Sequence, residues 1–271
     1  MVELYYERYP MLSKKEARNK IHQFYNGMKN CGWFSGFVFR LSDDRKTFYI
    51  RQSEYTAHLF KVELGDSEWL SQDFTEGSGI KIYARLHSEM LGGYSSIILR
   101  PLMIEHPSML ELPKLDEYAK QNNNNKDQFN PYEVFGLEMP AGSALNKLYM
   151  GGFLESLRHD KNSKGEIKPD CLLLELRIDK DTTLPARIYG NRCKVIYQHI
   201  KKLANRGYMY PLYFDSELRT KLIEDNSEQI LATYIHSDRI NVLDPTNLHK
   251  YFIGKPDWID DFVSRYQESV N

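Results

Sequence analysis

Residues 80–87 read Ile80-Lys81-Ile82-Tyr83-Ala84-Arg85-Leu86-His87, and this stretch decides the fold that we expect for the first half of the chain. An apolar side chain occupies every second position. Because successive side chains of a strand point to opposite faces of a sheet, the alternation predicts a half-buried β-strand. The same period of two occurs in residues 33–41, 47–52, 58–64 and 96–105. Pro101 in the last of these segments predicts a sheet edge or a bulge.

The order of these segments predicts a small barrel. Five strands with a polar insertion at residues 66–79, long enough for a short helix, are the order expected of an OB-type barrel. An SH3-like barrel or a curled antiparallel sheet would give a similar pattern. Ser13 and Glu16 form a capping box before a helical pattern that ends near Gly32. We therefore expect residues 1–112 to be a domain made of an N-terminal helix plus an OB-like five-stranded β-barrel.

The second half has a different pattern. Residues 113–142 include the asparagine run 122–125 and predict a linker or irregular connection. We expect residues 143–271 to be a C-terminal mixed α/β domain, which makes the whole chain α+β. Its predicted helices cover residues 143–160, 192–205 and 256–267, and its predicted strands cover 171–178, 208–214, 230–235 and 239–243. In the second helix we expect Val195, Ile196 and Leu203 to face inward. No internal repeat is apparent.

Composition narrows the class of protein. The 271 residues are 41% hydrophobic and 27% charged with a net charge of −1, which is ordinary for a folded chain. The three cysteines are too few for a disulfide framework, and the N-terminus lacks the pattern of a signal peptide. No apolar run approaches the ~20 residues of a membrane helix. We expect a cytoplasmic protein without a membrane partner. No nucleotide-binding or histidine-based metal motif occurs, so we expect no cofactor.

Basic and aromatic residues carry the functional prediction. No acidic residue occurs from Thr182 to Phe214, a stretch that contains candidate binding residues Arg187, Tyr189, Arg192, Lys194, Lys201, Lys202 and Arg206. Lysine and arginine neutralise phosphates, and tyrosine rings stack on unpaired bases. In the barrel, alternation places Lys81, Tyr83 and Arg85 on one face of a strand and places Tyr49 and Arg51 on one face of another.

These patterns favour non-catalytic binding of single-stranded DNA or RNA, in replication, repair or phage-related defence. An OB sheet binds oligonucleotides on such a surface. A protein-interaction adaptor stays open as an alternative, because tyrosine and arginine also favour protein interfaces.

The runner-up hypothesis, ahead of the adaptor, is a metal-dependent nuclease built on the second domain. The segment around Asp170, Glu175 and Arg177 resembles the metal-binding core of the PD-(D/E)XK nucleases. The resemblance implies Mg²⁺ held by Asp170 and Glu175, with Glu155 completing the set and Arg177 at the position of the family's lysine. Only four residues separate Asp170 from Glu175. On a single strand, this spacing would place the two side chains on opposite faces.

Overall fold

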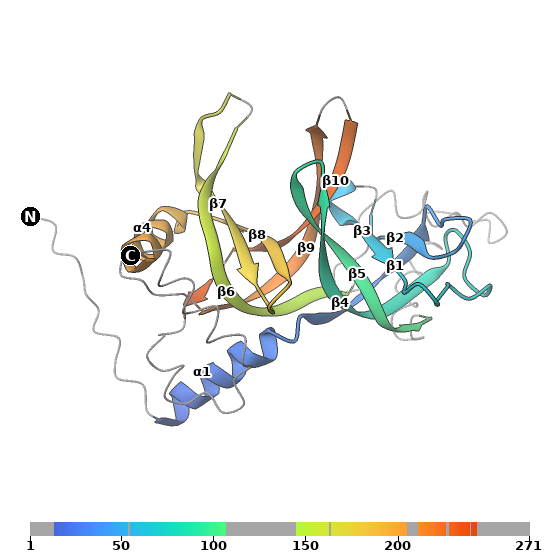
Figure 1. Ribbon diagram of the computed structural model, residues 1–271, viewed down its shortest axis with the longest axis horizontal. Helices are drawn as coiled ribbons and strands as arrows, with labels where there is room; N and C mark the ends of the chain where they lie inside the picture. Colours follow the sequence, from blue (N-terminus) through green and yellow to red (C-terminus); the bar gives the residue numbers. More distant parts are fainter. Residues whose placement is uncertain are drawn as a thin grey trace, which may run out of the picture.

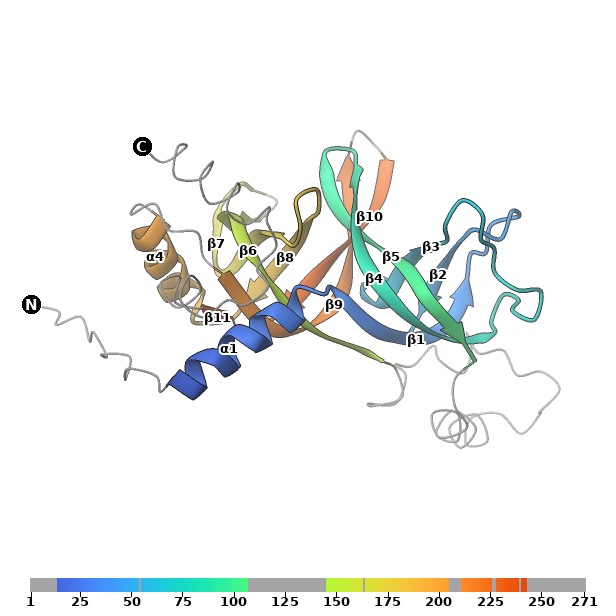
Figure 2. The ribbon, with the colours of Figure 1, turned by 60° about the horizontal axis from the view of Figure 1, so that its bottom comes forward.

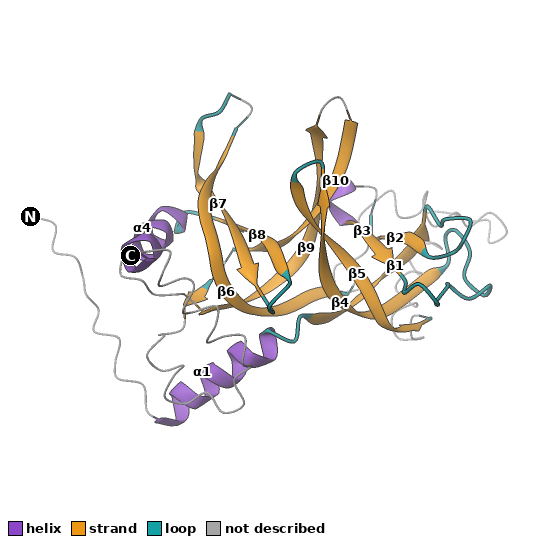
Figure 3. Ribbon diagram, viewed as in Figure 1, coloured by secondary structure: helices purple, strands orange, loops and turns teal. Residues whose placement is uncertain are grey.

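The chain is described from a computed structural model, which covers residues 14–53, 55–106, 145–162, 164–204, 211–225, 228–238 and 240–242. The fold is mostly β with few helices (Figures 1 and 3). Five strands form the first half: β1 (Cys31–Phe39), β2 (Thr47–Arg51), β3 (Leu59–Glu63), β4 (Gly79–Leu91) and β5 (Tyr94–Glu105). The second half contains β6 (Asn146–Lys161), β7 (Ile167–Arg177), β8 (Thr183–Tyr189), β9 (Pro211–Asp225), β10 (Glu228–Ser237) and β11 (Asn241–Val242). The helices are α1 (Lys14–Gly27), the 3₁₀ turn η1 (Thr56–His58) and α4 (Cys193–Ala204).

The first five strands pair in a closed order. β1 pairs with β2 and with β4, β2 pairs with β3, β3 runs parallel to β5, and β5 pairs with β4. We call these five strands the first circuit. All five lie where the alternating segments predicted strands. The register jumps from Tyr83↔Met103 to Ala84↔Pro101 and leaves Leu102 unpaired, which confirms the bulge predicted at Pro101.

The second half repeats this order of pairing. β6 pairs with β7 and with β9, β7 pairs with β8, β8 runs parallel to β10, and β10 pairs with β9. We call these strands the second circuit; β11 extends it beside β9. The expectation of no internal repeat is therefore wrong at the level of topology. The described part of residues 143–271 is mostly β, with α4 as its one α-helix, rather than the mixed α/β domain that we expected.

In each circuit, the segment between the third and fourth strands contributes buried side chains. We call this segment the plug of the circuit. In the second circuit the plug is α4, whose Cys193 and Ile200 side chains are buried. In the first circuit it is the loop 64–78, whose Leu70 and Phe74 are buried, and this loop is turns rather than the predicted short helix. The Arg45 guanidinium holds the loop by donating to the carbonyl oxygens of Leu70 (2.8 Å) and Phe74 (2.6 Å).

The predicted helix over residues 143–160 is instead the 16-residue strand β6. Its apolar run fits both periods, and Leu148 and Met150 are buried with a spacing of two. The two glycines in the run disfavour a helix. Gly151 also allows the close approach of α1, because a Cβ at this position would lie 2.4 Å from the carbonyl oxygen of Phe24.

The two circuits are joined by hydrogen bonds. β1 pairs with β6 at Trp33↔Lys147, so that the eleven strands form one continuous sheet. The Thr220 hydroxyl donates to the carbonyl oxygen of Leu59 (2.5 Å). Helix α1, which precedes the first circuit, packs on β6 and β9 of the second (Figure 2). Residues 113–142 lie outside the described residues, so the division into two domains stays a prediction. Among the described helices, none is long and apolar enough to cross a membrane.

Candidate nucleic-acid interface

The outer face of β6, β7 and β8 presents the first candidate surface. The inward positions of β7 and β8 are buried leucine, alanine and isoleucine side chains: Leu172, Leu174, Leu176, Leu184, Ala186 and Ile188. The intervening side chains therefore point outward. Arg158 of β6 lies across from Leu173 of β7, which lies across from Arg187 of β8. This row places two guanidinium groups on one exposed face.

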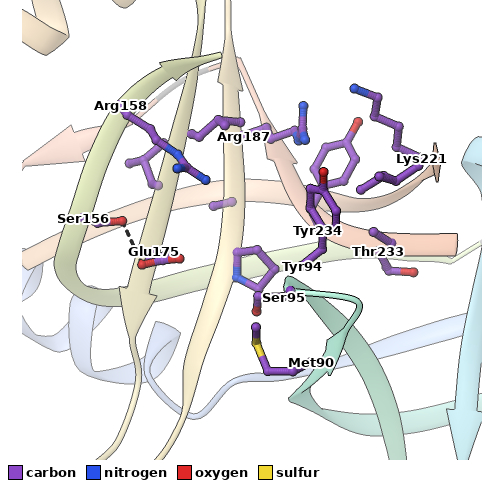
Figure 4. A pocket seen from close by; sticks show the side chains of 17 residues that line it. Met90, Tyr94, Ser95, Ser156, Arg158, Glu175, Arg187, Lys221, Thr233 and Tyr234 are labelled. Carbon is purple, nitrogen blue, oxygen red and sulfur yellow. Dashed lines mark hydrogen bonds between the residues drawn. The ribbon is translucent and has the colours of Figure 1, made fainter. Parts of the chain in front are cut away.

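A pocket of about 150 Å³ lies between this face and the β4–β5 hairpin of the first circuit (Figure 4). Three basic side chains line it: Arg158, Arg187 and Lys221. Among the described residues of the lining, Glu175 is the only one with a carboxylate, and it accepts a hydrogen bond of 2.8 Å from the Ser156 hydroxyl. The charged side chains of the lining therefore have a net positive charge, and most of the other lining residues are apolar or aromatic.

Arg187 is the most constrained of these bases. Its Nη1 lies 3.1 Å from Oδ2 of Asp160, and its Cζ lies 4.9 Å from the ring centroid of Tyr234. Burial alone would raise the pKa of Asp160, but the positive charges of Arg187 and Lys168 contribute to lowering it overall. Asp160 partly neutralises Arg187, whereas Arg158 and Lys221 are exposed at the pocket. Burial raises the pKa of Tyr189, the next outward residue of β8, far above its ordinary value.

The first circuit carries a related surface on its own first three strands. Phe39 of β1 lies across from Tyr49 of β2, which lies across from Lys61 of β3. The guanidinium carbons of Arg51 and Arg40 lie 5.1 and 5.2 Å from the Phe39 ring centroid. The predicted pair Tyr49 and Arg51 therefore flanks an aromatic ring that the sequence analysis did not single out.

The predicted face of β4 lies on the other side of β1. Lys81 Nζ lies 4.6 Å from the Trp33 ring centroid, and the Tyr83 ring lies 5.2 Å from the same ring. Arg85 is exposed beyond them, and Lys147 of β6 pairs with Trp33 from the opposite edge. Lys81 also pairs with Glu105 at 3.0 Å. The surface around Trp33, on β1, β4 and β6, therefore extends across the junction between the two circuits.

The basic residues of α4 lie elsewhere. Arg192, Lys194 and Lys201 are exposed, and Lys201 Nζ lies 5.5 Å from the Tyr197 ring centroid. None of these residues lines the pocket. The prediction that Val195 faces inward is wrong: Val195 is 67% exposed, because Cys193 and Ile200 anchor the other side of the helix. The side chains of Lys202 and Arg206 lie outside the described residues.

Of the residues of the nuclease hypothesis, the structure brings Glu155 and Arg177 together, whereas Glu175 has a different partner. Glu155 lies on a strand rather than a helix, and it pairs with Arg177 at 2.7 Å and accepts from the Thr183 hydroxyl at 2.8 Å. Glu175 bonds to Ser156 rather than to a basic residue. Asp170 is exposed. Within the described ranges, no group of three histidine, cysteine, aspartate or glutamate side chains could hold a metal ion. The geometry does not support the nuclease alternative.

Several residues of these surfaces escaped the sequence analysis. They are Arg158, Lys221, Tyr234 and Tyr94 at the pocket, and Trp33, Phe39 and Lys147 near β1. Arg158 was missed because residues 143–160 were predicted to form a helix. Only the alternation of side chains along a strand places Arg158 on the outer face. The others come together through pairings between distant strands, for which a single sequence gives no signal.

No protein-family model and no curated protein matches the sequence. Among solved structures, the chain is similar to the wild-type single-stranded DNA binding protein from Thermus aquaticus, with a TM-score of 0.45 and 12% identity over 79% of this chain and 92% of that chain. A deletion mutant of the same protein gives a TM-score of 0.47 and 14% identity over 79% and 93%. A small single-stranded DNA binding protein from Mycoplasma pneumoniae gives a TM-score of 0.25 and 19% identity over 37% and 93%. Every one of these TM-scores is below 0.5.

Proposed function

We propose that this protein binds single-stranded nucleic acid, DNA or RNA, without catalysis, and that each circuit is an OB-like barrel. The observation that carries the proposal is a correspondence between the circuits. In both, the outer face of the first three strands carries arginine or lysine side chains beside an aromatic ring. These are Phe39, Tyr49, Arg51 and Lys61 in the first circuit, and in the second Arg158 and Arg187, with Arg187 against the ring of Tyr234 on the neighbouring strand β10.

The chemistry of these faces suits a single strand. Cationic side chains neutralise phosphates and release counterions, which supplies affinity without sequence preference. Aromatic rings add stacking with any base that is not already stacked in a duplex. A pocket of about 150 Å³ has room for one small group rather than a double helix. An unpaired strand can place a single base there, whereas the bases of a duplex are paired and stacked inside the helix.

Binding of a fluorescently labelled oligonucleotide, followed by anisotropy, tests the proposal. The double variant Arg158→Ala/Lys221→Ala removes two exposed cations from the pocket. We expect affinity to fall on the order of tenfold, and the salt slope to decrease by about 0.7 for each lost phosphate contact of the single strand. Lys180→Ala is the matched control, because Lys180 is exposed in the turn between β7 and β8.

The control variant should bind like the wild type. Equal affinities for the double variant and the control would show that the pocket does not contact the strand. Circular dichroism of each variant establishes that a loss of affinity does not arise from unfolding.

A further inference from the structure

The β4–β5 hairpin belongs to the first circuit but reaches the second. Its turn is made by Gly92 and Gly93, whose φ angles of 52° and 81° suit a tight hairpin. Met90 and Tyr94, on either side of this turn, both line the pocket of the second circuit. Figures 1 and 2 show the hairpin beside the β9–β10 hairpin. Both side chains remain accessible, with Tyr94 43% exposed and Met90 69% exposed.

A buried hydrogen bond fixes the hairpin in this place. The backbone N–H of Thr233 on β10 donates to the Ser96 hydroxyl on β5 at 3.0 Å, and both residues are buried. The Thr233 hydroxyl lies 2.8 Å from that of Thr220 on β9, which continues the polar contact within the second circuit. Tyr94 is two residues from Ser96, and Tyr234 follows Thr233. This hydrogen bond therefore lies next to two tyrosines, one from each circuit, that line a common pocket.

Two kinds of side chain in the lining are suited to contact a nucleotide (Figure 4). Tyr94 and Tyr234 are aromatic, whereas Arg158, Arg187 and Lys221 are cationic. A nucleotide has the same division, because its base offers a flat apolar face and its phosphate offers negative charge. The small volume limits the pocket to one such unit.

We infer that the pocket is a single-nucleotide subsite in which Tyr94 of the first circuit stacks on one unpaired base while the second circuit holds the adjacent phosphate. This inference rests on the proposed function and deepens it. It makes Tyr94 a binding residue, and it makes the two circuits one binding unit rather than two independent modules.

Two ligands of equal length separate stacking from phosphate contact. One is a labelled single-stranded oligonucleotide, and the other has the same number of phosphates with every base removed. Tyr94→Ala should weaken binding of the oligonucleotide by about tenfold, the order expected for loss of stacking on one base. The same variant should bind the base-free ligand as the wild type does. Tyr94→Phe keeps the ring and should keep the affinity.

Tyr55→Ala is the matched control, because Tyr55 is 52% exposed and lies outside the pocket. It should change neither affinity. An independent readout is photochemical cross-linking of an oligonucleotide that carries a halogenated uracil, followed by mass spectrometry. The cross-linked peptides should contain Tyr94 or Tyr234.

The possible failures are distinguishable. Equal weakening of both ligands by Tyr94→Ala would show a structural role and overturn the inference, as would unchanged binding of both. If the wild-type protein binds neither ligand, the proposed function itself fails.

Discussion

The guanidinium carbon of Arg187 on β8 lies 4.9 Å from the ring centroid of Tyr234 on β10. The two strands are parallel neighbours, so the contact closes the sheet of the second circuit on its outer side. Arg187 also pairs with Asp160 of β6 at 3.1 Å. One side chain therefore links three strands at the wall of the pocket, and its removal should affect stability as well as binding.

Arg187→Ala should lower the free energy of unfolding by about 3 kcal/mol, because it leaves the buried carboxylate of Asp160 without its nearest cation. Urea denaturation measures the change. Adding Asp160→Asn to Arg187→Ala should recover part of the lost free energy of unfolding, because the negative charge of the carboxylate is then removed. Arg158→Ala is the control, and its exposed side chain predicts a change within about 0.5 kcal/mol. Similar losses for Arg187→Ala and Arg158→Ala would contradict this account of the ion pair.

Asp160 should also make stability depend on pH. Its pKa in the folded protein is lowered from the ordinary 3.8, so its ionised form stabilises the fold. This stabilisation is complete above about pH 5 and is lost as the pH falls through 3.8 towards the lowered pKa. Urea midpoints of the wild type and Asp160→Asn should therefore differ at neutral pH and converge in acid. A difference between the two urea midpoints that stays constant down to about pH 3 would exclude Asp160 as the source of the pH dependence.

Because α1 packs closely on β6, adding a single methyl group at Gly151 should lower the stability of the fold. A Cβ on Gly151 would lie 2.4 Å from the carbonyl oxygen of Phe24, so Gly151→Ala must displace the helix. We expect a loss of about 1–3 kcal/mol in thermal or urea unfolding. At Gly65 a Cβ would meet its nearest neighbour, Glu68, at 3.6 Å, and Gly65→Ala should be tolerated. Equal stability of the two variants would show that α1 does not pack as described.

The asparagine-rich stretch predicts where a protease cuts. Residues 121–127 are polar and cannot bury a core, so limited proteolysis should cleave there first. Because β1 pairs with β6 and α1 packs on the second circuit, we expect the two fragments to co-elute on size exclusion. Fragments that separate without denaturant would instead indicate two independent domains.

The first circuit was predictable because its strands alternate cleanly, with one face buried, as at residues 80–87. The second was not, and β6 shows why. Its run from Leu148 to Leu154 is apolar at nearly every position, because the strand is buried by α1 as well as by its own circuit. Such a run fits a helix and a strand equally well. Once β6 was assigned as a helix, the repeated order of strands could not be recognised.

The candidate site was predictable only in part. Tyr49, Arg51, Lys81, Tyr83, Arg85 and Arg187 do lie on outer faces, as their alternation within single strands implied. The basic residues of α4 do not lie on these faces. The number of charges in a stretch of sequence does not indicate where the helix packs in the fold. Tyr94 and Tyr234 lie together beside the Ser96–Thr233 hydrogen bond, whose two residues are 137 positions apart in the sequence. No local pattern encodes such a contact.

The salt dependence of oligonucleotide binding tests the central claim most directly. Anisotropy of labelled single-stranded DNA and RNA, titrated from about 50 to 200 mM salt, gives the slope of log affinity against log salt. Contact with roughly four phosphates, at about 0.7 each for a single strand, predicts a slope of about −3, with weaker binding of a duplex of equal length. An absence of binding at about 50 mM salt, or a slope near zero, would contradict the proposal that this protein binds single-stranded nucleic acid through its basic and aromatic faces.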